Sequence, residues 1–185
     1  MRVCSPQSIE YFERNFIESL NVIVDSSYLI IQCTRNTRAR ISVAQKMRKK
    51  SKNDIKKYIS TSVDPQTGCM FVITMGSENI PVGTVGYWEK EWDGQTVWET
   101  GWSVLSEYQR QEIATVAAKL VIELVIKLRS HRYLFAYPSV DNHPSNAICR
   151  KLGFILMGDK DFEYPPGNIL HCNIWRFDLL KISNT

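Results

Sequence analysis

Hydrophobic residues recur along this chain with two different periods, and the longest regular stretch has the period of a helix. Between residues 113 and 128 the apolar positions fall three or four apart and form one broad face, which predicts an amphipathic helix. A shorter helix, with proline at its start and glycine after its end, is predicted over 144–152. Helical spacing also predicts helices over 7–20 and over the strongly basic residues 41–59.

Runs of β-branched and aromatic residues, bounded by turn residues, predict the strands. In the middle of the chain they cover 69–74, 82–88 and 97–104, and the turn-rich residues 76–79 and the pair Asp93-Gly94 separate them. Three strands joined in this way favour an antiparallel meander. Further strands are predicted on both sides of the meander, over 20–24, 28–33, 133–140, 154–157 and 169–179.

The order of these elements predicts the fold class. A helix and two strands come first, then the meander, and then a strand–helix–strand half. This order indicates a mixed α/β sheet with helices packed on both faces. No internal repeat, low-complexity tract or long linker divides the sequence. We therefore expect a single domain over 1–185, in which 1–27 form a variable N-terminal helical segment.

Composition narrows the class of protein without identifying it. Of the 185 residues, 44% are hydrophobic and 23% are charged, the balance of an ordinary globular protein. No apolar run approaches the roughly 20 residues that cross a bilayer, and the N-terminus lacks the apolar core of a signal peptide. We therefore expect a cytoplasmic protein with no membrane partner. The net charge of +4 is too small to indicate nucleic acid, but it suits an anionic cofactor.

The cysteines predict neither disulfides nor a metal site. The five are scattered and show no paired spacing, which argues against a disulfide framework and against zinc. We expect each to be a small buried residue or an unused thiol: Cys4, Cys33, Cys69, Cys149 and Cys172.

The junction between the third meander strand and the long helix is the first candidate site. A tight strand-to-helix turn leaves the first helical N–H groups without partners, and the helix dipole adds positive potential there. Such a helix start is suited to binding phosphate. Arg110 adds a positive charge and the Thr115 hydroxyl adds a donor. Many strand-to-helix junctions share these features, so a purely structural role stays open.

The start of the shorter helix is the second candidate site. Asn142 ends the preceding strand, and its side-chain amide can both donate to and accept from an amide-bearing ligand. The same position suits a helix cap. Ligand binding and capping are therefore both open for this residue.

Together the two stretches resemble the GNAT acetyltransferase superfamily, especially its branch that acetylates antibiotics and protein N-termini, ribosomal proteins included. The family's phosphate loop, Gln/Arg-x-x-Gly-x-Gly/Ala, is matched at Gln109 and Ala114, with Val104 at the expected distance before it. The resemblance covers residues 68–180. The family's second signature, Asn-x-x-Ser/Ala-x-x-φ-x-x-Lys-x-Gly-Phe, is matched at Asn142, Ser145, Ile148, Lys151, Gly153 and Phe154.

The resemblance implies that the chain is an acyltransferase with acetyl-CoA as cosubstrate and no metal. It implies transfer of the acetyl group straight to a primary amine, without a covalent enzyme intermediate. A backbone N–H near Val104 would polarise the thioester carbonyl, because two parallel strands of the family separate there. The implied cofactor-binding residues are Val104, Leu105, Gln109, Arg110, Gln111, Glu112, Ile113, Ala114, Thr115, Asn142 and Ser145.

Two residues depart from the family pattern. Glu112 replaces the loop glycine, and Arg110 stands where a second glycine is frequent. Glycine lets the backbone approach a phosphate closely, whereas a carboxylate there repels it unless it points outward, paired with Arg110 or Arg132. Cys149 stands where many relatives carry a tyrosine that protonates the departing thiolate.

Two side chains are implied for the chemistry. Glu99 is the candidate base, and its neighbours Trp98 and Trp102 would desolvate it and raise its pKa. Its alternative role is a strand carboxylate that pairs with a neighbouring strand. Ser145 is the candidate on the thiol side, as a weak proton donor or as a hydrogen bond to the cofactor.

The acceptor is not identified by any residue. The tryptophans at 88, 92, 98 and 102 line an acceptor groove or belong to the core, and both interpretations stay open. We expect a small-molecule amine or a protein N-terminus as acceptor, no nucleic acid, and leave a homodimer open. Two other functions compete: a non-catalytic acyl-CoA-binding relative, and a ribosome- or RNA-associated module that uses the basic strip 46–57.

Overall fold

The computed structural model describes most of residues 66–181 and two short segments before them. The predicted helices over 7–20 and 41–59 and the basic strip 46–57 lie outside the described residues, and a single domain over 1–185 stays a prediction. Residues 22–24 and 29–32 are described by their backbone alone. The described residues are 22–24, 29–32, 66–76, 78, 80–163 and 167–181.

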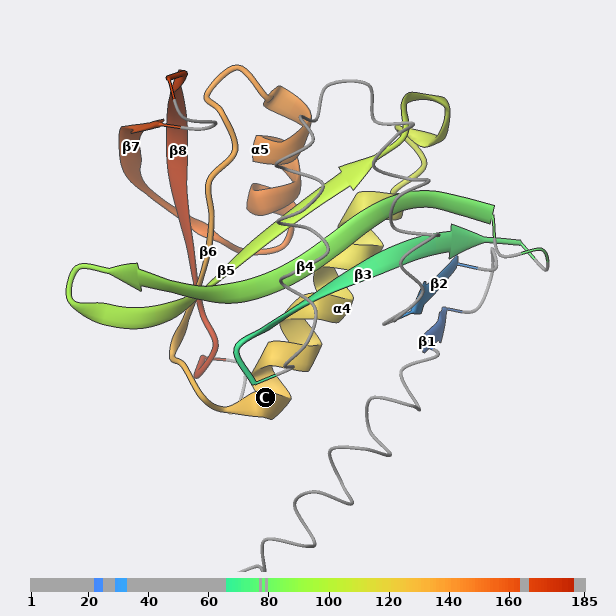
Figure 1. Ribbon diagram of the computed structural model, residues 1–185, viewed down its shortest axis with the longest axis horizontal. Helices are drawn as coiled ribbons and strands as arrows, with labels where there is room; N and C mark the ends of the chain where they lie inside the picture. The colour runs from blue at the N-terminus through green and yellow to red at the C-terminus, as the bar shows by residue number, and fades with distance from the viewer. Residues whose placement is uncertain are drawn as a thin grey trace, which may run out of the picture.

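One mixed sheet contains all eight strands of the described residues, in the order β1-β2-β3-β4-β5-β6-β8-β7 (Figure 1). Neighbours in this sheet pair antiparallel, except β5 and β6, which are parallel. The mixed α/β class predicted from the sequence is therefore confirmed. The strands are β1 Val22–Val24, β2 Leu29–Gln32, β3 Gly68–Met75, β4 Ile80–Trp92, β5 Gln95–Val104, β6 Tyr133–Ala136, β7 Ile155–Glu163 and β8 Ile169–Asp178.

The central meander is confirmed, and its turn has the geometry that the sequence indicates. Asp93 and Gly94 have φ angles of 50° and 72°, the left-handed pair of a type I′ hairpin turn. Trp92 and Gln95 face each other across this turn. Strands β4 and β5 are longer than predicted, because polar and aromatic residues continue to alternate up to the turn.

Two α-helices lie on one face of the sheet. Helix α4 spans Ile113–Leu128, as predicted, and α5 spans His143–Lys151. Both contribute to one core cluster, in which Val121 and Cys149 pack with Trp98 of β5. No helix of the described residues is long and apolar enough to cross a membrane. The prediction that helices also cover the opposite face falls on residues outside the described part of the chain.

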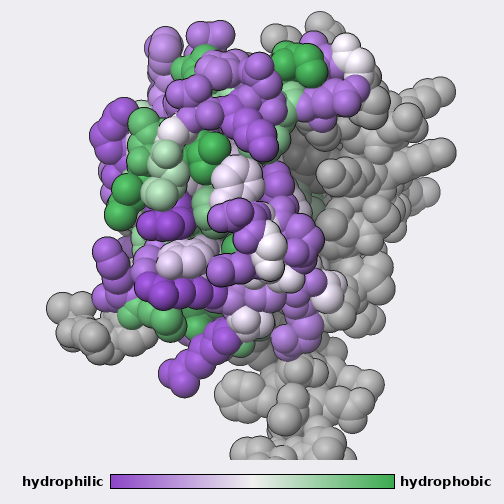
Figure 2. Space-filling model, turned by 90° about the vertical axis from the view of Figure 1, so that its left-hand side faces the viewer, coloured by the Kyte–Doolittle hydropathy of each residue, from purple (hydrophilic) through white to green (hydrophobic). Residues whose placement is uncertain are grey.

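The free edge of the sheet at β7 is unusually exposed. Ile155, Leu156 and Met157 have 50%, 50% and 48% of their surface accessible. Figure 2 views the molecule from the side on which β7 lies, and it shows hydrophobic groups interrupting a largely hydrophilic surface. An edge strand with exposed apolar residues is open to pairing with another chain. A homodimer stays a prediction.

Candidate functional site

The parallel pair β5–β6 is short, and this opens the sheet. Only Trp98–Leu134 and Glu99–Phe135 are paired between the two strands. Strand β5 continues to Val104, whereas β6 ends at Ala136. In Figure 1, β5 and the chain that follows β6 diverge toward the top of the view. The sheet therefore contains a gap beyond Glu99, flanked by the end of β5.

The backbone of Val104 faces this gap. The next residue, Leu105, donates its N–H to the Val82 carbonyl of β4 at 2.9 Å. Successive residues of an antiparallel strand direct their backbone groups to opposite sides, so the N–H of Val104 points away from β4. The Val104 carbonyl, which points to the same side as its N–H, is likewise not bonded to β4. It accepts a hydrogen bond from Nε2 of the Gln109 side chain at 3.1 Å.

The loop before α4 contains two left-handed residues. After the 3-10 turn η1, Ser106–Tyr108, residues Arg110 and Glu112 have φ angles of 62° and 59°. For residues other than glycine, this conformation costs about 1 kcal/mol each. The family motif places glycine at 112, and glycine is frequent at 110, so the chain keeps the loop conformation without the residue that favours it.

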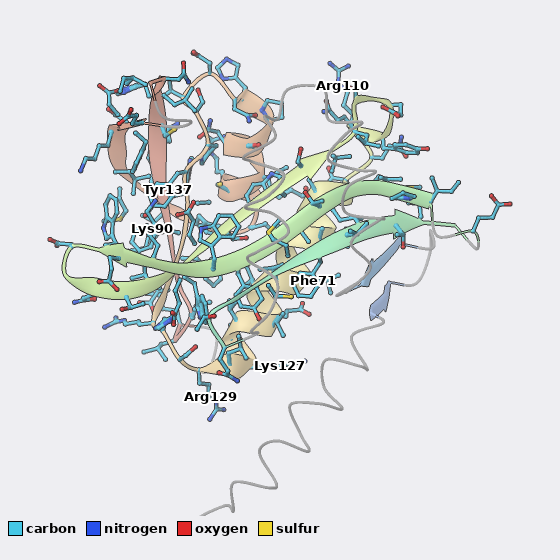
Figure 3. All side chains as sticks on the ribbon, viewed as in Figure 1. Phe71, Lys90, Arg110, Lys127, Arg129 and Tyr137 are labelled. Atoms are coloured by element: carbon cyan, nitrogen blue, oxygen red, sulfur yellow. The ribbon has the colours of Figure 1, made fainter. Side chains whose placement is uncertain are left out.

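The start of α4 offers free donors. The first intrahelical bond after the loop runs from the Val116 N–H to the Glu112 carbonyl, at 3.0 Å. The N–H groups of residues 113–115 therefore have no intrahelical acceptor. Figure 3 shows Arg110 at the top of the molecule, projecting outward from this loop. Positive potential and free donors thus coincide at one end of the gap.

Glu112 forms an ion pair that the sequence did not predict. Its Oε2 lies 2.6 Å from Nζ of Lys151, in the last turn of α5. The hydrogen bond from Lys151, followed by one from the Thr115 side chain, lowers the pKa of the Glu112 carboxyl. The predicted partners, Arg110 and Arg132, were wrong. Arg132 instead pairs with Asp178 at 3.1 Å, and Lys151 reaches Glu112 because α5 ends beside the start of α4.

The start of α5 contains a cap and a buried amide. Asn142 caps the helix, since its Oδ1 accepts from the Ser145 N–H at 3.2 Å. Sequence reasoning missed Asn146, which is buried and binds the Ser139 and Asn142 carbonyls, both at 2.9 Å. Its Oδ1 accepts from Asn173 and from the Trp175 indole, both at 2.8 Å. A polar residue on the buried face of a predicted helix was the available signal.

Cys149 cannot replace the tyrosine of the family pattern. Its side chain is fully buried in the core beneath α5. Burial raises the pKa of its thiol to about 12. A thiol in that position neither meets a ligand in the gap nor exchanges a proton with it at neutral pH. Cys149 is therefore a small core residue, as the sequence indicated for the cysteines in general.

Glu99 lies on the face opposite α4 and is paired. Its Oε2 is 2.9 Å from Nζ of Lys90, on the adjacent strand β4. Trp98 and Trp102 pack in the core on the α4 side, so the expectation that they desolvate Glu99 was wrong. Side chains of a strand alternate between faces, and adjacent positions cannot enclose one another's side chains. The structure thus shows the strand pairing that was the alternative for Glu99, and its role as the base stays a prediction.

Aromatic residues surround the Lys90–Glu99 pair, and sequence reasoning missed this arrangement. The Lys90 ammonium lies 4.0 Å from the ring centre of Tyr137 and 5.0 Å from that of Phe162. Figure 3 shows Lys90 and Tyr137 side by side next to β4. The Tyr137 hydroxyl is buried and has no hydrogen-bond partner among the described residues. Burial, and then the charge of Glu99, raise the pKa of Tyr137, so it stays protonated.

The family model of the acetyltransferase (GNAT) domain matches residues 27–155. The chain therefore belongs to the GNAT acetyltransferase family, and its class of activity is acyl transfer. No match was found among curated protein sequences. Among the described residues no cluster of three or more His, Cys, Asp or Glu side chains could hold a metal ion.

Solved structures support the fold assignment. One is RimL, a ribosomal L7/L12 alpha-N-protein acetyltransferase in complex with coenzyme A, with 18% identity, a TM-score of 0.67, and coverage of 84% of this chain and 97% of that one. A GNAT-family acetyltransferase from Bacillus anthracis has 18% identity, a TM-score of 0.64 and coverage of 85% and 98%. The microcin C7 self-immunity acetyltransferase MccE, in complex with acetyl-CoA and AMP, has 17% identity, a TM-score of 0.67 and coverage of 87% and 99%.

Proposed function

We propose that this acyltransferase takes an acetyl group from acetyl-CoA and transfers it directly to a primary amine. The observation that carries the proposal is the gap between β5 and β6, which opens beyond Glu99 beside the start of α4. A gap of this kind can accept the extended pantetheine arm against exposed strand backbone, with the diphosphate at the helix start. Coenzyme A in RimL and acetyl-CoA in MccE support the choice of donor.

The residues at the helix start fit a diphosphate. The N–H groups of 113–115 supply donors, and Arg110 supplies a charge at the same loop. Glu112 is the unfavourable group, but its charge is compensated by Lys151 at 2.6 Å. The like-charge repulsion between Glu112 and a phosphate is therefore smaller than for an unpaired carboxylate.

The transfer itself requires a neutral amine, a polarised carbonyl and a proton for the thiolate. The Val104 N–H, which faces the gap, is the proposed donor to the thioester oxygen. The amine nitrogen attacks the carbonyl carbon, the C–S bond breaks, and Glu99 takes the amine proton directly or through water. Ser145, at the start of α5, is the proposed hydrogen-bond donor to the departing sulfur, and the thiolate takes its proton from water through this hydroxyl, since Cys149 is buried.

We propose a small-molecule amine or a protein N-terminus as the acceptor. RimL is described as an acetyltransferase of a ribosomal protein, which supports a protein N-terminus. MccE is described as a self-immunity acetyltransferase, which supports a small molecule. Both acceptors present the same primary amine, so the choice between them depends on surfaces around the gap and not on the chemistry.

Two measurements test donor binding and transfer separately. Acetyl-CoA at 100 times its dissociation constant should add about 2.7 kcal/mol to the free energy of unfolding, which a thermal shift detects. Pantetheine, which lacks the diphosphate, is the matched control and should add less. No shift with millimolar acetyl-CoA would overturn the donor. A shift without thiol release, across a panel of primary amines and N-terminal peptides, would leave a binding protein and not an enzyme.

A further inference from the structure

The Lys90 ammonium lies in a cage built from three separate elements of the sheet. Glu99 of β5 provides a carboxylate at 2.9 Å from Nζ. Tyr137, which follows β6, and Phe162 of β7 present their rings at 4.0 and 5.0 Å. These three residues are called the cation cage below. Its members are far apart in sequence, and the fold alone brings them together.

The cage has the composition that binds alkylammonium ions. A carboxylate neutralises the charge, and aromatic rings attract a cation through their negative faces. The Tyr137 ring also packs on other aromatic side chains. Its centroid lies 5.9 Å from that of Phe135, on which it stacks, and 5.5 Å from that of Trp92. Phe162 in turn contacts Tyr137 at 5.1 Å. The arrangement is therefore supported by packing that does not depend on Lys90.

The cation cage also lies beside the gap between β5 and β6, where the proposed transfer requires the acceptor amine. Glu99 is the last residue of β5 that pairs with β6, so its carboxylate stands where the gap begins. The buried Tyr137 hydroxyl has no partner among the described residues, although buried hydroxyls normally have one. An additional polar ligand atom near Tyr137 and Glu99 would satisfy that hydroxyl.

We propose that the cation cage binds an alkylammonium group of the acceptor, and that Lys90 is its intramolecular occupant, displaced when the acceptor binds. That the bound ammonium belongs to the acceptor rests on the proposed function. Binding of an alkylammonium ion by the cage does not. It narrows the acceptor to amines that present a flexible aliphatic ammonium resembling a lysine side chain. Cationic acceptors then compete with Lys90 for Glu99.

An alkylammonium ion from solution can displace the Lys90 ammonium from the cation cage. The Lys90 and Glu99 side chains keep 28% and 20% of their surface exposed, so an ion from solution can reach them. The lysine stem has four rotatable carbons along which the ammonium can withdraw. An internal occupant lowers the apparent affinity for an external ion in proportion to its own occupancy.

The first experiment measures binding of n-butylammonium, which has the length of a lysine side chain, by titration calorimetry without acetyl-CoA. Removing the occupant with Lys90→Met should tighten binding about tenfold. Lys160→Met is the matched control, because Lys160 lies 6.0 Å from the Trp92 ring, outside the cage, and carries the same charge. Equal affinities in the two variants would overturn the proposal, since the gain would then reflect net charge alone.

A second comparison tests the rings directly. In the Lys90→Met background, Tyr137→Phe, which keeps the ring and loses only the hydroxyl contact, should bind n-butylammonium more tightly than Tyr137→Leu, which loses both. Neutral n-butanol should bind to none of these variants. If Tyr137→Leu binds n-butylammonium as well as its parent, the cage is not the site.

The unmodified protein provides a test that no folding defect can obscure. The ε-methylene protons of Lys90 should be shifted upfield in the NMR spectrum by the Tyr137 ring. Saturating n-butylammonium should return them toward the values of a free lysine, and unchanged shifts would contradict displacement. None of these measurements involves acetyl-CoA. Failure of the cage therefore leaves the proposed donor untouched, and loss of acetyl-CoA binding would leave the cage untouched.

Discussion

At the scale of single residues, the loop before α4 keeps its conformation although its sequence departs from the family motif. Arg110 and Glu112 adopt the left-handed geometry usually assigned to glycine there. Glu112 is held by Lys151, a residue of the second family signature. The two departures that the sequence presents as obstacles are therefore compatible with a phosphate-binding loop. What remains specific to this chain is a carboxylate close to the helix start.

Replacing Glu112 with glutamine should strengthen acetyl-CoA binding several-fold. The substitution keeps the size of the side chain, deletes its charge and releases the Lys151 ammonium to interact with a phosphate. Because the groups are exposed, the gain should shrink at high salt. Calorimetry at two salt concentrations measures it. Lys151→Met, the matched control, should weaken binding. Unchanged affinity in Glu112→Gln at both concentrations would mean that the carboxylate lies beyond the reach of the diphosphate.

Substituting Glu99 tests its role as the base. Glu99→Gln should lower turnover by roughly 10²–10⁴-fold and leave acetyl-CoA affinity nearly unchanged. A second variant tests the ion pair between Lys90 and Glu99. Lys90→Met removes the partner of the Glu99 carboxylate but keeps the carboxylate itself, so it should lower turnover less than Glu99→Gln does. Steady-state kinetics with a saturating donor separates the two variants. Full activity in Glu99→Gln would reduce Glu99 to a structural partner of Lys90.

The buried thiol of Cys149 predicts a loss of stability at alkaline pH. Burial raises its pKa to about 12, whereas a cysteine in an unfolded chain ionises near about pH 8.5. Between these values the unfolded state releases a proton that the folded state retains, so the free energy of unfolding falls as pH rises. Denaturant unfolding at about pH 8 and about pH 10 should show a loss about 2 kcal/mol larger in the wild type than in Cys149→Ala. Equal losses would mean that the thiol ionises in the folded protein.

At the scale of elements, the sequence pattern predicted the features that depend on neighbouring residues, namely helix bounds and turns. The period of the apolar residues gave the bounds of α4, and the Asp93-Gly94 pair gave the hairpin turn, because both depend on neighbours in sequence. Strand β6 is shorter than predicted, since its continuous pairing with β8 covers Tyr133–Ala136 and is followed only by an isolated bridge between Ser139 and Cys172. Pairing partners are distant in sequence, so strand ends could not be predicted from the pattern alone.

The candidate site divides in the same way. The loop before α4 and the cap at Asn142 follow from motifs on single elements. The pairs Glu112–Lys151 and Lys90–Glu99 join residues of different elements, and no spacing in the sequence indicates them. The assignment of Trp98 beside Glu99 was an avoidable error, because strand alternation already separates adjacent residues.

Asn146 connects the elements that surround α5, and its removal should be costly. The Asn146→Ala variant leaves the Trp175 indole and the Asn173 side-chain amide without their present acceptor, whereas the Ser139 and Asn142 carbonyls keep backbone N–H donors. Unsatisfied buried groups of this kind should lower the free energy of unfolding by about 3 kcal/mol. Asn142→Ala, which removes only a cap, should cost about 1 kcal/mol. Denaturant unfolding compares them. Similar losses in both variants would mean that water replaces the amide in the interior.

At the scale of the whole molecule, one irregularity in the sheet organises the site. Within the described sheet β4–β5 and β7–β8 pair over ten and eight residue pairs and β6–β8 over four, whereas only two residue pairs join the halves at β5–β6. The sheet separates beyond that short contact. The end of β5 and the start of α4 thereby come to the same edge, and Lys151 at the end of α5 reaches the loop between them. A ligand in the gap would contact both halves at once.

This arrangement predicts which backbone amides acetyl-CoA should protect from hydrogen exchange. The Val104 N–H faces the gap and those of 113–115 lack an intrahelical acceptor, so donor binding should satisfy them. At 100 times the dissociation constant their exchange should slow about a hundredfold if the bound form is fully protected. Leu105 is the internal control, because its N–H already donates to Val82 and should change little. Protection of Leu105 equal to that of Val104 would indicate general stiffening of the sheet and not a ligand in the gap. If acetyl-CoA protected the N–H groups of 113–115 but not that of Val104, only the diphosphate would bind as proposed. The thioester would then lie outside the gap.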